Sequence, residues 1–183
     1  MCNIRAIAGW LIAAEIATLL AVSFISYAVF ASGTIFLIFL AKGALMMAAF
    51  SFAATLGAVG VALALASASP CASGACATQG TGLRNFLISL MAALVAVEVL
   101  IVLAMQTQSN TIITALAVAI AAVGLLWVAA GERLNALDTC LRAPTVPQAP
   151  VVTIAWTGAY FTGITTVASV IVWAIFTAAA ASG

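Results

Sequence analysis

The sequence has very few charged side chains and no histidine. Asp, Glu, Lys and Arg make up 5% of the 183 residues, whereas 67% are hydrophobic. A chain of this composition cannot coat a water-soluble globule with polar groups, so lipid must be its solvent. The absence of histidine removes the usual axial ligand of haem and the commonest ligand of transition metals. We therefore expect no cofactor, and we expect lipid to be bound.

Basic clusters and catalytic motifs are also missing. The net charge is +1, which provides no positive field to hold a nucleic acid. The sequence contains no nucleophile with a matching base, no phosphate-cradling glycine loop and no dinucleotide fingerprint. We therefore expect neither an enzyme nor a nucleic-acid-binding protein.

Long apolar runs make up most of the chain. Since a hydrocarbon layer about 30 Å thick needs roughly 20 apolar residues per helix, the length leaves room for about five spans. The sequence predicts an all-α, polytopic transmembrane helix bundle in a single domain. Its spans are predicted at about 6–30, 35–66, 83–105, 111–130 and 151–180. After residue 130, leucines at helical spacing opposite charged residues predict a short amphipathic helix that lies along the headgroups.

The arginines predict an orientation. Those that flank the predicted spans all fall on one side of the bundle: Arg5, Arg84, Arg133 and Arg142. The short turns on the other side, near 31–34 and 106–110, carry no charge. Because Lys and Arg near span ends are retained in the cytoplasm, we expect a cytoplasmic N-terminus and an outside C-terminus. The membrane we expect is a bacterial inner (plasma) membrane.

Three ionisable residues fall inside predicted spans: Glu15, Lys42 and Glu98. Counting about 1.5 Å per residue from the span ends places Lys42 and Glu98 at a similar depth near the midplane. This predicts an ion pair between the second and third spans, with Glu15 about one helical turn away. Such residues rarely face lipid, so three interpretations stay open. They form a cation or proton path, they fix helix register, or one of them meets a partner subunit.

Four cysteines fall on the arginine-rich side: Cys2, Cys71, Cys76 and Cys140. Four thiolates can hold zinc, but their spacing lacks the two short pairs of a usual zinc knuckle, so they are weak metal candidates. Cys71 and Cys76 could close a small disulfide loop. A lasting disulfide needs an oxidising compartment, however, which conflicts with the predicted orientation. We therefore predict reduced thiols.

Small and hydroxylated residues indicate faces where helices pack, because apolar contact alone gives no drive for association in lipid. The candidate positions for packing or for a partner are Gly57, Gly60, Gly158, Thr162, Thr166 and Ser169. Four aromatic residues are predicted to anchor the bundle at the membrane interfaces: Trp10, Trp127, Trp156 and Tyr160.

The leading functional hypothesis is a small accessory or scaffold subunit of a larger membrane protein complex. The spans carry many small-residue faces, while the loops are too short for a substrate-binding domain. Its expected partners are the lipid bilayer and other membrane subunits. A channel or an ion- or proton-coupled transporter that uses Glu15, Lys42 and Glu98 is the first alternative. A membrane thiol-redox or metal-handling protein that uses the cysteines is the second.

Overall fold

Five long helices form most of the protein. The computed structural model describes residues 2–30, 35–68, 71, 74–107 and 109–182, and side chains within them except those of 35–40 and 180–182. The helices are α1 (Ile4–Phe30), α2 (Ile35–Ala66), α4 (Ala77–Thr107), α5 (Asn110–Leu141) and α6 (Pro150–Ser182), and a short 3-10 helix, η1 (Gly74–Cys76), precedes α4. All five long helices are long and apolar enough to cross a membrane. The predicted all-α transmembrane bundle is confirmed.

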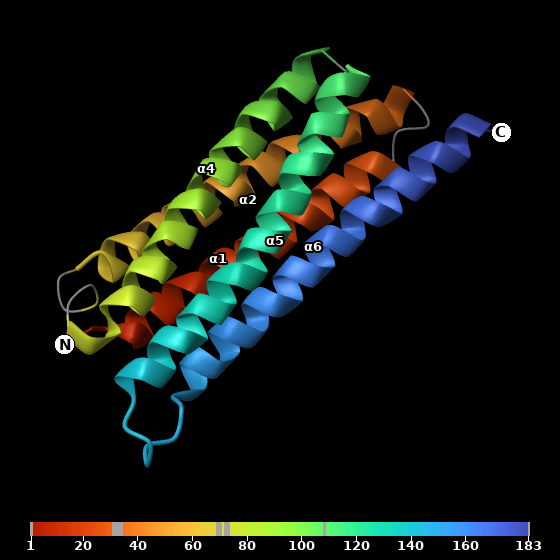
Figure 1. Cartoon of the computed structure of the whole chain (residues 1–183). Coiled ribbons are helices and arrows are strands. Elements are labelled where there is room, and N and C mark those ends of the chain that lie inside the picture. Colours follow the sequence, from red (N-terminus) through yellow and green to blue (C-terminus); the bar gives the residue numbers. More distant parts are fainter. Residues whose placement is uncertain (1, 31–34, 69–70, 72–73, 108, 183) are drawn as a thin grey trace.

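The helices form a closed ring. Each packs against two others in the order α1, α2, α4, α5, α6 and back to α1 (Figure 1). The first and last helices are therefore neighbours, and they run parallel. The interior of the ring is filled by large apolar side chains, among them Leu11, Phe52, Leu87, Ile120 and Trp127, all of them buried. The ring therefore encloses a packed apolar core, as protein interiors generally do.

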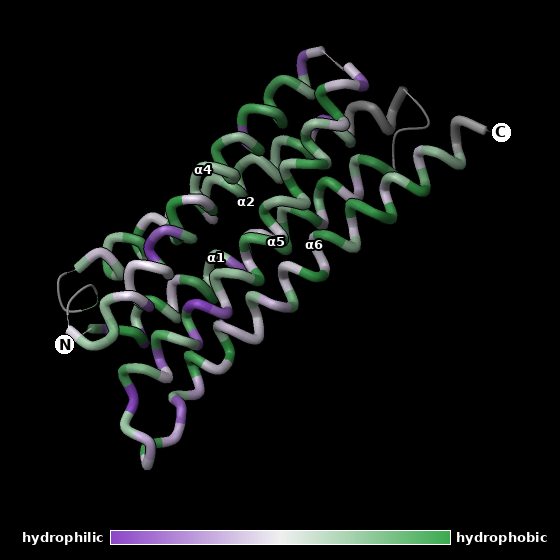
Figure 2. Tube along the Cα trace, in the orientation of Figure 1, coloured by the Kyte–Doolittle hydropathy of each residue, from purple (hydrophilic) through white to green (hydrophobic). Residues whose placement is uncertain are grey.

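The outside of the ring is apolar along most of its length (Figure 2). Large hydrophobic side chains such as Phe50, Phe161 and Ile175 are more than 60% exposed. Hydrophilic residues gather at the end of the bundle that holds the α5–α6 connection (Figure 2). Water-soluble monomers rarely expose continuous apolar surfaces of this kind, so the outside of the ring is suited to lipid.

The helices are longer than the hydrocarbon layer is thick. With 27 to 33 residues each and a rise of about 1.5 Å per residue, they reach roughly 40–50 Å, against about 30 Å of hydrocarbon. They must tilt or project from the layer. Helix α2 runs unbroken past Gly57 and Gly60.

Two helix boundaries differ from the sequence prediction. Helix α4 begins at Ala77 instead of about residue 83, since Gly80 is buried and Gly82 lies against the side chain of Arg133. Packing thus outweighs the helix-breaking tendency of these glycines. The predicted amphipathic stretch is helical, but it continues α5 without a break instead of turning along the headgroups, because Leu134 and Leu137 are buried in the bundle. The turn predicted at 31–34 lies outside the described residues.

Candidate functional site

Two disulfides close one end of the bundle. The Cys2–Cys71 disulfide joins the segment before α1 to the α2–α4 connection, and the Cys76–Cys140 disulfide joins η1 to the end of α5. The prediction of reduced thiols is therefore wrong, and the small loop between Cys71 and Cys76 does not form. The partners lie 69 and 64 residues apart in the chain and meet only because the helix ends converge. Pairing leaves no thiolate at these positions to bind zinc.

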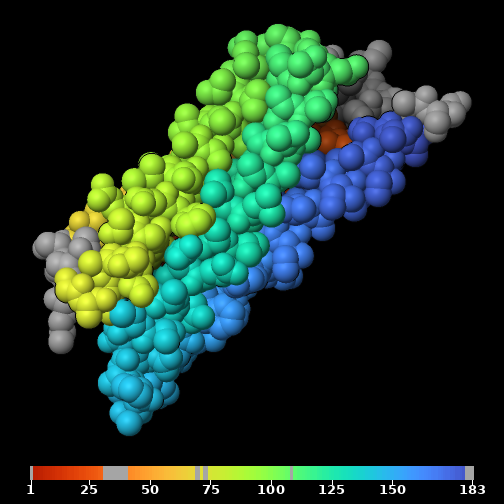
Figure 3. Space-filling view, viewed as in Figure 1, coloured from red at the N-terminus to blue at the C-terminus, as the bar shows by residue number. Residues whose placement is uncertain are grey.

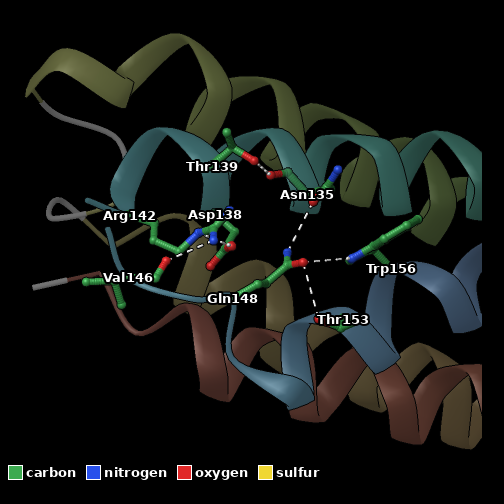
Figure 4. Close-up of polar contacts among 8 residues, drawn as sticks. All are labelled: Asn135, Asp138, Thr139, Arg142, Val146, Gln148, Thr153 and Trp156. Atoms are coloured by element: carbon green, nitrogen blue, oxygen red, sulfur yellow. Dashed lines mark hydrogen bonds and ion pairs between the residues drawn. The ribbon is translucent and has the colours of Figure 1, made fainter. Parts of the chain in front are cut away.

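The same end carries a network that fixes the turn after α5 (Figure 4). Arg142 lies with its Nε 3.5 Å from Oδ2 of Asp138, and its NH1 donates a hydrogen bond of 2.9 Å to the backbone oxygen of Val146. Asp138 is buried, so this pair is better shielded from water than a surface ion pair. The chain is thereby held in a fixed path as it leaves α5.

Gln148 fixes the start of α6 (Figure 4). Its Nε2 donates to Oδ1 of Asn135 at 3.1 Å, and its Oε1 accepts from Oγ1 of Thr153 at 3.2 Å and from Nε1 of Trp156 at 3.4 Å. One amide thus links the end of α5 to the first two turns of α6. Trp156, predicted as an interface anchor, uses its indole N–H in this network.

Glu15 lies inside the bundle, between α1 and α6. It is only 4% exposed, and a Cβ placed on Gly158 would collide with its Oε2. The missing side chain of Gly158 therefore makes the room that the carboxyl group occupies. Oε1 of Glu15 is buried and has no hydrogen-bond partner among the described residues.

The level of Glu15 follows from the α5–α6 contact. Gly131 lies against Ala159 and the backbone of Trp156, so Gly158 and Glu15 are level with Gly131, the residue before Glu132. Glu132 is exposed and accepts a hydrogen bond of 2.8 Å from the hydroxyl of Tyr160. Glu15 thus lies at the level where Glu132 and Tyr160 reach the outer surface of the bundle.

The predicted ion pair between Lys42 and Glu98 does not form. Within the described residues, the pair between Arg142 and Asp138 is the only ion pair. Gly60 of α2 faces the side chain of Met91 of α4, which sets the register of these two antiparallel helices. At about 1.5 Å per residue, Lys42 then lies roughly 10–16 Å beyond Glu98 along the bundle. Depths counted from predicted span ends ignore this stagger, which explains the wrong prediction.

Lys42 and Glu98 therefore have separate surroundings. Lys42 is exposed on α2, about two turns from its first residue. Glu98 is half-buried at the seam between α4 and α2, two turns beyond Met91 on the same face of α4. Its Oε1 is buried and finds no hydrogen-bond partner in the described part of the chain. The three ionisable residues that the sequence singled out are not brought together.

The predicted packing stripe of α6 lies mostly inside the bundle. Gly158, Thr162 and Thr166 are turned towards α1 and α5, whereas Ser169 is half-buried and donates to the backbone of its own helix. On α2, Gly60 has only the tip of Met91 near it and Gly57 has no neighbour. The stripe on α6 is therefore an internal packing face.

Sequence reasoning missed the closest helix contact, between α5 and α6. A Cβ on Gly124 would lie 2.8 Å from the backbone oxygen of Gly163, and one on Gly163 would collide with the backbone oxygen of Gly124. Gly131 makes the third contact of this interface, since a Cβ there would lie 2.9 Å from that of Ala159. The seven-residue spacing of Gly124 and Gly131 was the available signal, because it places both on one helix face. It also explains why Trp127, predicted as an interface anchor, is fully buried between them.

At the opposite end, α5 and α6 separate and expose α1 between them (Figure 3). The resulting groove of about 200 Å³ is lined mainly by apolar side chains. They include Ile25, Leu116, Ile120, Val170 and Trp173. A groove of this chemistry suits a lipid acyl chain.

Comparison with known protein families, characterised proteins and solved structures finds no match to this chain.

Proposed function

We propose that this integral membrane protein is an accessory or scaffold subunit of a larger membrane complex. The observation that carries the proposal is Glu98. Its carboxyl group is half-buried at the α2–α4 seam, and the described residues supply neither an ion pair nor a hydrogen bond to its buried Oε1. An ionisable group inside a span is costly and normally meets a polar partner.

The surroundings of Glu98 indicate what this partner is. The nearby outward-facing residues are apolar, with Val95 and Val99 about half exposed on α4 and Phe50 exposed on α2. Such a surface accepts the apolar face of a transmembrane helix. A basic or hydrogen-bond-donating side chain on that helix would satisfy the carboxyl of Glu98.

Native mass spectrometry of the protein purified from its own membrane in mild detergent tests the proposal. The wild-type chain should carry a protein partner, and Glu98→Leu should lower the bound fraction several-fold. Val172→Leu, at an exposed apolar position on α6 away from the α2–α4 seam, is the matched control and should retain the partner. A wild-type chain that is monomeric in native membranes, or a complex that survives Glu98→Leu unchanged, would refute the proposal.

We also propose an orientation opposite to the one that the arginines predict. Two disulfides lie at the N-terminal end of the bundle, and disulfides persist in oxidising compartments. Two of the arginines at this end are engaged within the chain. Arg142 pairs with Asp138, and Cζ of Arg133 lies 5.4 Å from the ring centroid of Phe86. The disulfide end then faces outwards, to the periplasm in a bacterium, and the C-terminus is cytoplasmic.

Reporter fusions and thiol labelling decide the orientation. A phosphatase fused to the C-terminus should be inactive and a fluorescent protein active there. After mild reduction of intact cells, a membrane-impermeant maleimide should label Cys71 and Cys76. An active phosphatase together with unlabelled thiols would restore the orientation predicted from the arginines.

The enclosure of Glu15 favours proton binding as a second candidate function. An ion path through Glu15, Lys42 and Glu98 together would need these groups to approach one another, and their separation in the bundle weighs against it. Of the three groups, Glu15 alone is fully enclosed within the bundle.

A further inference from the structure

Three polar atoms in the interior of the bundle have no hydrogen-bond partner among the described residues. They are Oε1 of Glu15 on α1, Nε1 of Trp127 on α5 and Oγ1 of Thr162 on α6. The three residues are 4%, 0% and 1% exposed, respectively. A buried polar group without a partner costs about 1–3 kcal/mol, so each of the three needs an explanation.

The contacts of α6 place the three residues in one layer. Glu15 lies against Gly158, and Thr162 follows one helical turn later on the same helix. Trp127 lies between the two α5 glycines that contact Ala159 and Gly163, so it is level with this turn of α6. Three neighbouring helices thus bring a carboxyl group, an indole N–H and a hydroxyl group within about one helical turn of one another along the core.

The chemistry of these groups selects the ligand. A hard metal cation takes oxygen ligands, and an indole N–H, which can only donate, would repel it. Water both donates and accepts, and buried water molecules typically make about three hydrogen bonds to otherwise unpaired polar groups. A protonated carboxyl group fits the same set, since its O–H donates while its carbonyl oxygen accepts.

No charged group faces the carboxyl of Glu15 from the described residues. Helix α6 carries no Asp, Glu, Lys or Arg, and the only charged residue of α2, Lys42, is exposed near the opposite end. On α5, Glu132 and Arg133 are level with this layer but exposed on the outside of the ring, where they contact Tyr160 and Phe86. Asp138 of α5 is buried, but it lies nearer the disulfide end and pairs there with Arg142. On α4, Arg84 is exposed and Glu98 is half-buried at the seam with α2. The core therefore offers no countercharge to an ionised Glu15.

We infer that Glu15, Trp127 and Thr162 form an internal proton-binding site, in which a protonated Glu15 is linked through buried water to the indole N–H and the hydroxyl group. Glu15 is the part of the site nearest the disulfide end, at the level where Glu132 and Tyr160 reach the surface. Water from that side of the membrane is the nearest source and acceptor of the proton. The inference does not depend on the proposed role of Glu98 in binding a partner.

Infrared spectroscopy of the full-length protein in lipid nanodiscs tests the site. At neutral pH, wild-type protein should show the C=O band of a protonated carboxylic acid, and Glu15→Gln should remove it. Glu132→Gln, which changes an exposed carboxyl at the same level, is the matched control and should leave the band in place. Persistence of the band in Glu15→Gln, or its absence from the wild type, would overturn the inference.

Two further variants keep the carboxyl group and test the water link. Trp127→Phe and Thr162→Val remove one polar group each, and both should shift the C=O band of Glu15, because the hydrogen bonding of the acid changes. Trp156→Phe removes an indole N–H that is already bonded to Gln148, and it should leave the band unmoved. An unshifted band in both core variants would show that the three groups do not share a site.

Discussion

Glu15 and Glu98 occupy similar apolar sequence contexts but opposite situations in the ring. Glu15 is enclosed where α1 meets α6, because Gly158 lacks the side chain that would collide with it. Glu98 stays half-buried at the α2–α4 seam, where a Cβ on Gly60 would meet only the flexible tip of Met91, at 3.9 Å. The closeness of the neighbouring helix therefore decides whether an intramembrane carboxyl becomes internal or remains available to a partner.

The largest expected effect comes from separating these two parts of the ring. The Cys76–Cys140 disulfide joins η1, at the start of α4, to the end of α5. It therefore links the loosely packed α2–α4 seam to the side of the ring where α5 and α6 pack closely through their glycines. Replacing both cysteines by alanine should lower the free energy of unfolding by about 2–4 kcal/mol, the usual effect of losing a disulfide. Unfolding by SDS titration in mixed micelles measures it. The Cys2–Cys71 disulfide holds only the segment before α1, so its removal should lower the free energy of unfolding by less. Equal losses from the two pairs would contradict this view of the ring.

A smaller loss is expected when the space for Glu15 is filled. Gly158→Ala places a methyl group on the carboxyl of Glu15 and should cost about 1–3 kcal/mol in the same unfolding measurement, as overpacking typically does. Shortening the carboxyl side chain as well, with Glu15→Ala, should return part of that loss because the collision disappears. Strictly additive losses would show that the two residues do not compete for space.

The smallest effect on the free energy of unfolding is expected at Gly57 of α2, on the loosely packed α2–α4 side of the ring. Gly57 has no atom within 4 Å of a Cβ position, so Gly57→Ala meets nothing. The substitution should raise the free energy of unfolding by up to about 1 kcal/mol, since alanine favours a helix over glycine. A loss comparable to that of Gly158→Ala would mean that this face of α2 is covered by another molecule.

The fold follows from the sequence because the bilayer restricts what an apolar run can do. Five runs separated by polar or glycine-containing segments can only become five helices, as the lipid leaves no other way to satisfy the backbone. The predicted start of α4 is wrong because Gly80 and Gly82 resemble a loop until their contacts are known. Local composition does not reveal which glycines another helix will cover.

The candidate site is harder to predict, because it depends on helix stagger and rotation. Span ends give Lys42 and Glu98 similar depths, yet the contact between Gly60 and Met91 separates them along the bundle. The burial of Trp127 is signalled only by the glycines that flank it, Gly124 and Gly131. The enclosure of Glu15 has no local signal, since it arises from a helix distant in sequence. Glu15 could be named from its charge alone, but its neighbours could not.

The neighbouring positions of α1 and α6 have a consequence for biogenesis. Synthesis proceeds from the N-terminus, so α1 enters the membrane long before α6 has been made. Until then nothing occupies the place of Gly158 beside Glu15, and the carboxyl group must be tolerated by the insertion machinery or by lipid. A helix that is translated late thus covers a polar group of α1. A chain truncated before Pro150 should therefore be recognised as incomplete and degraded by membrane quality control.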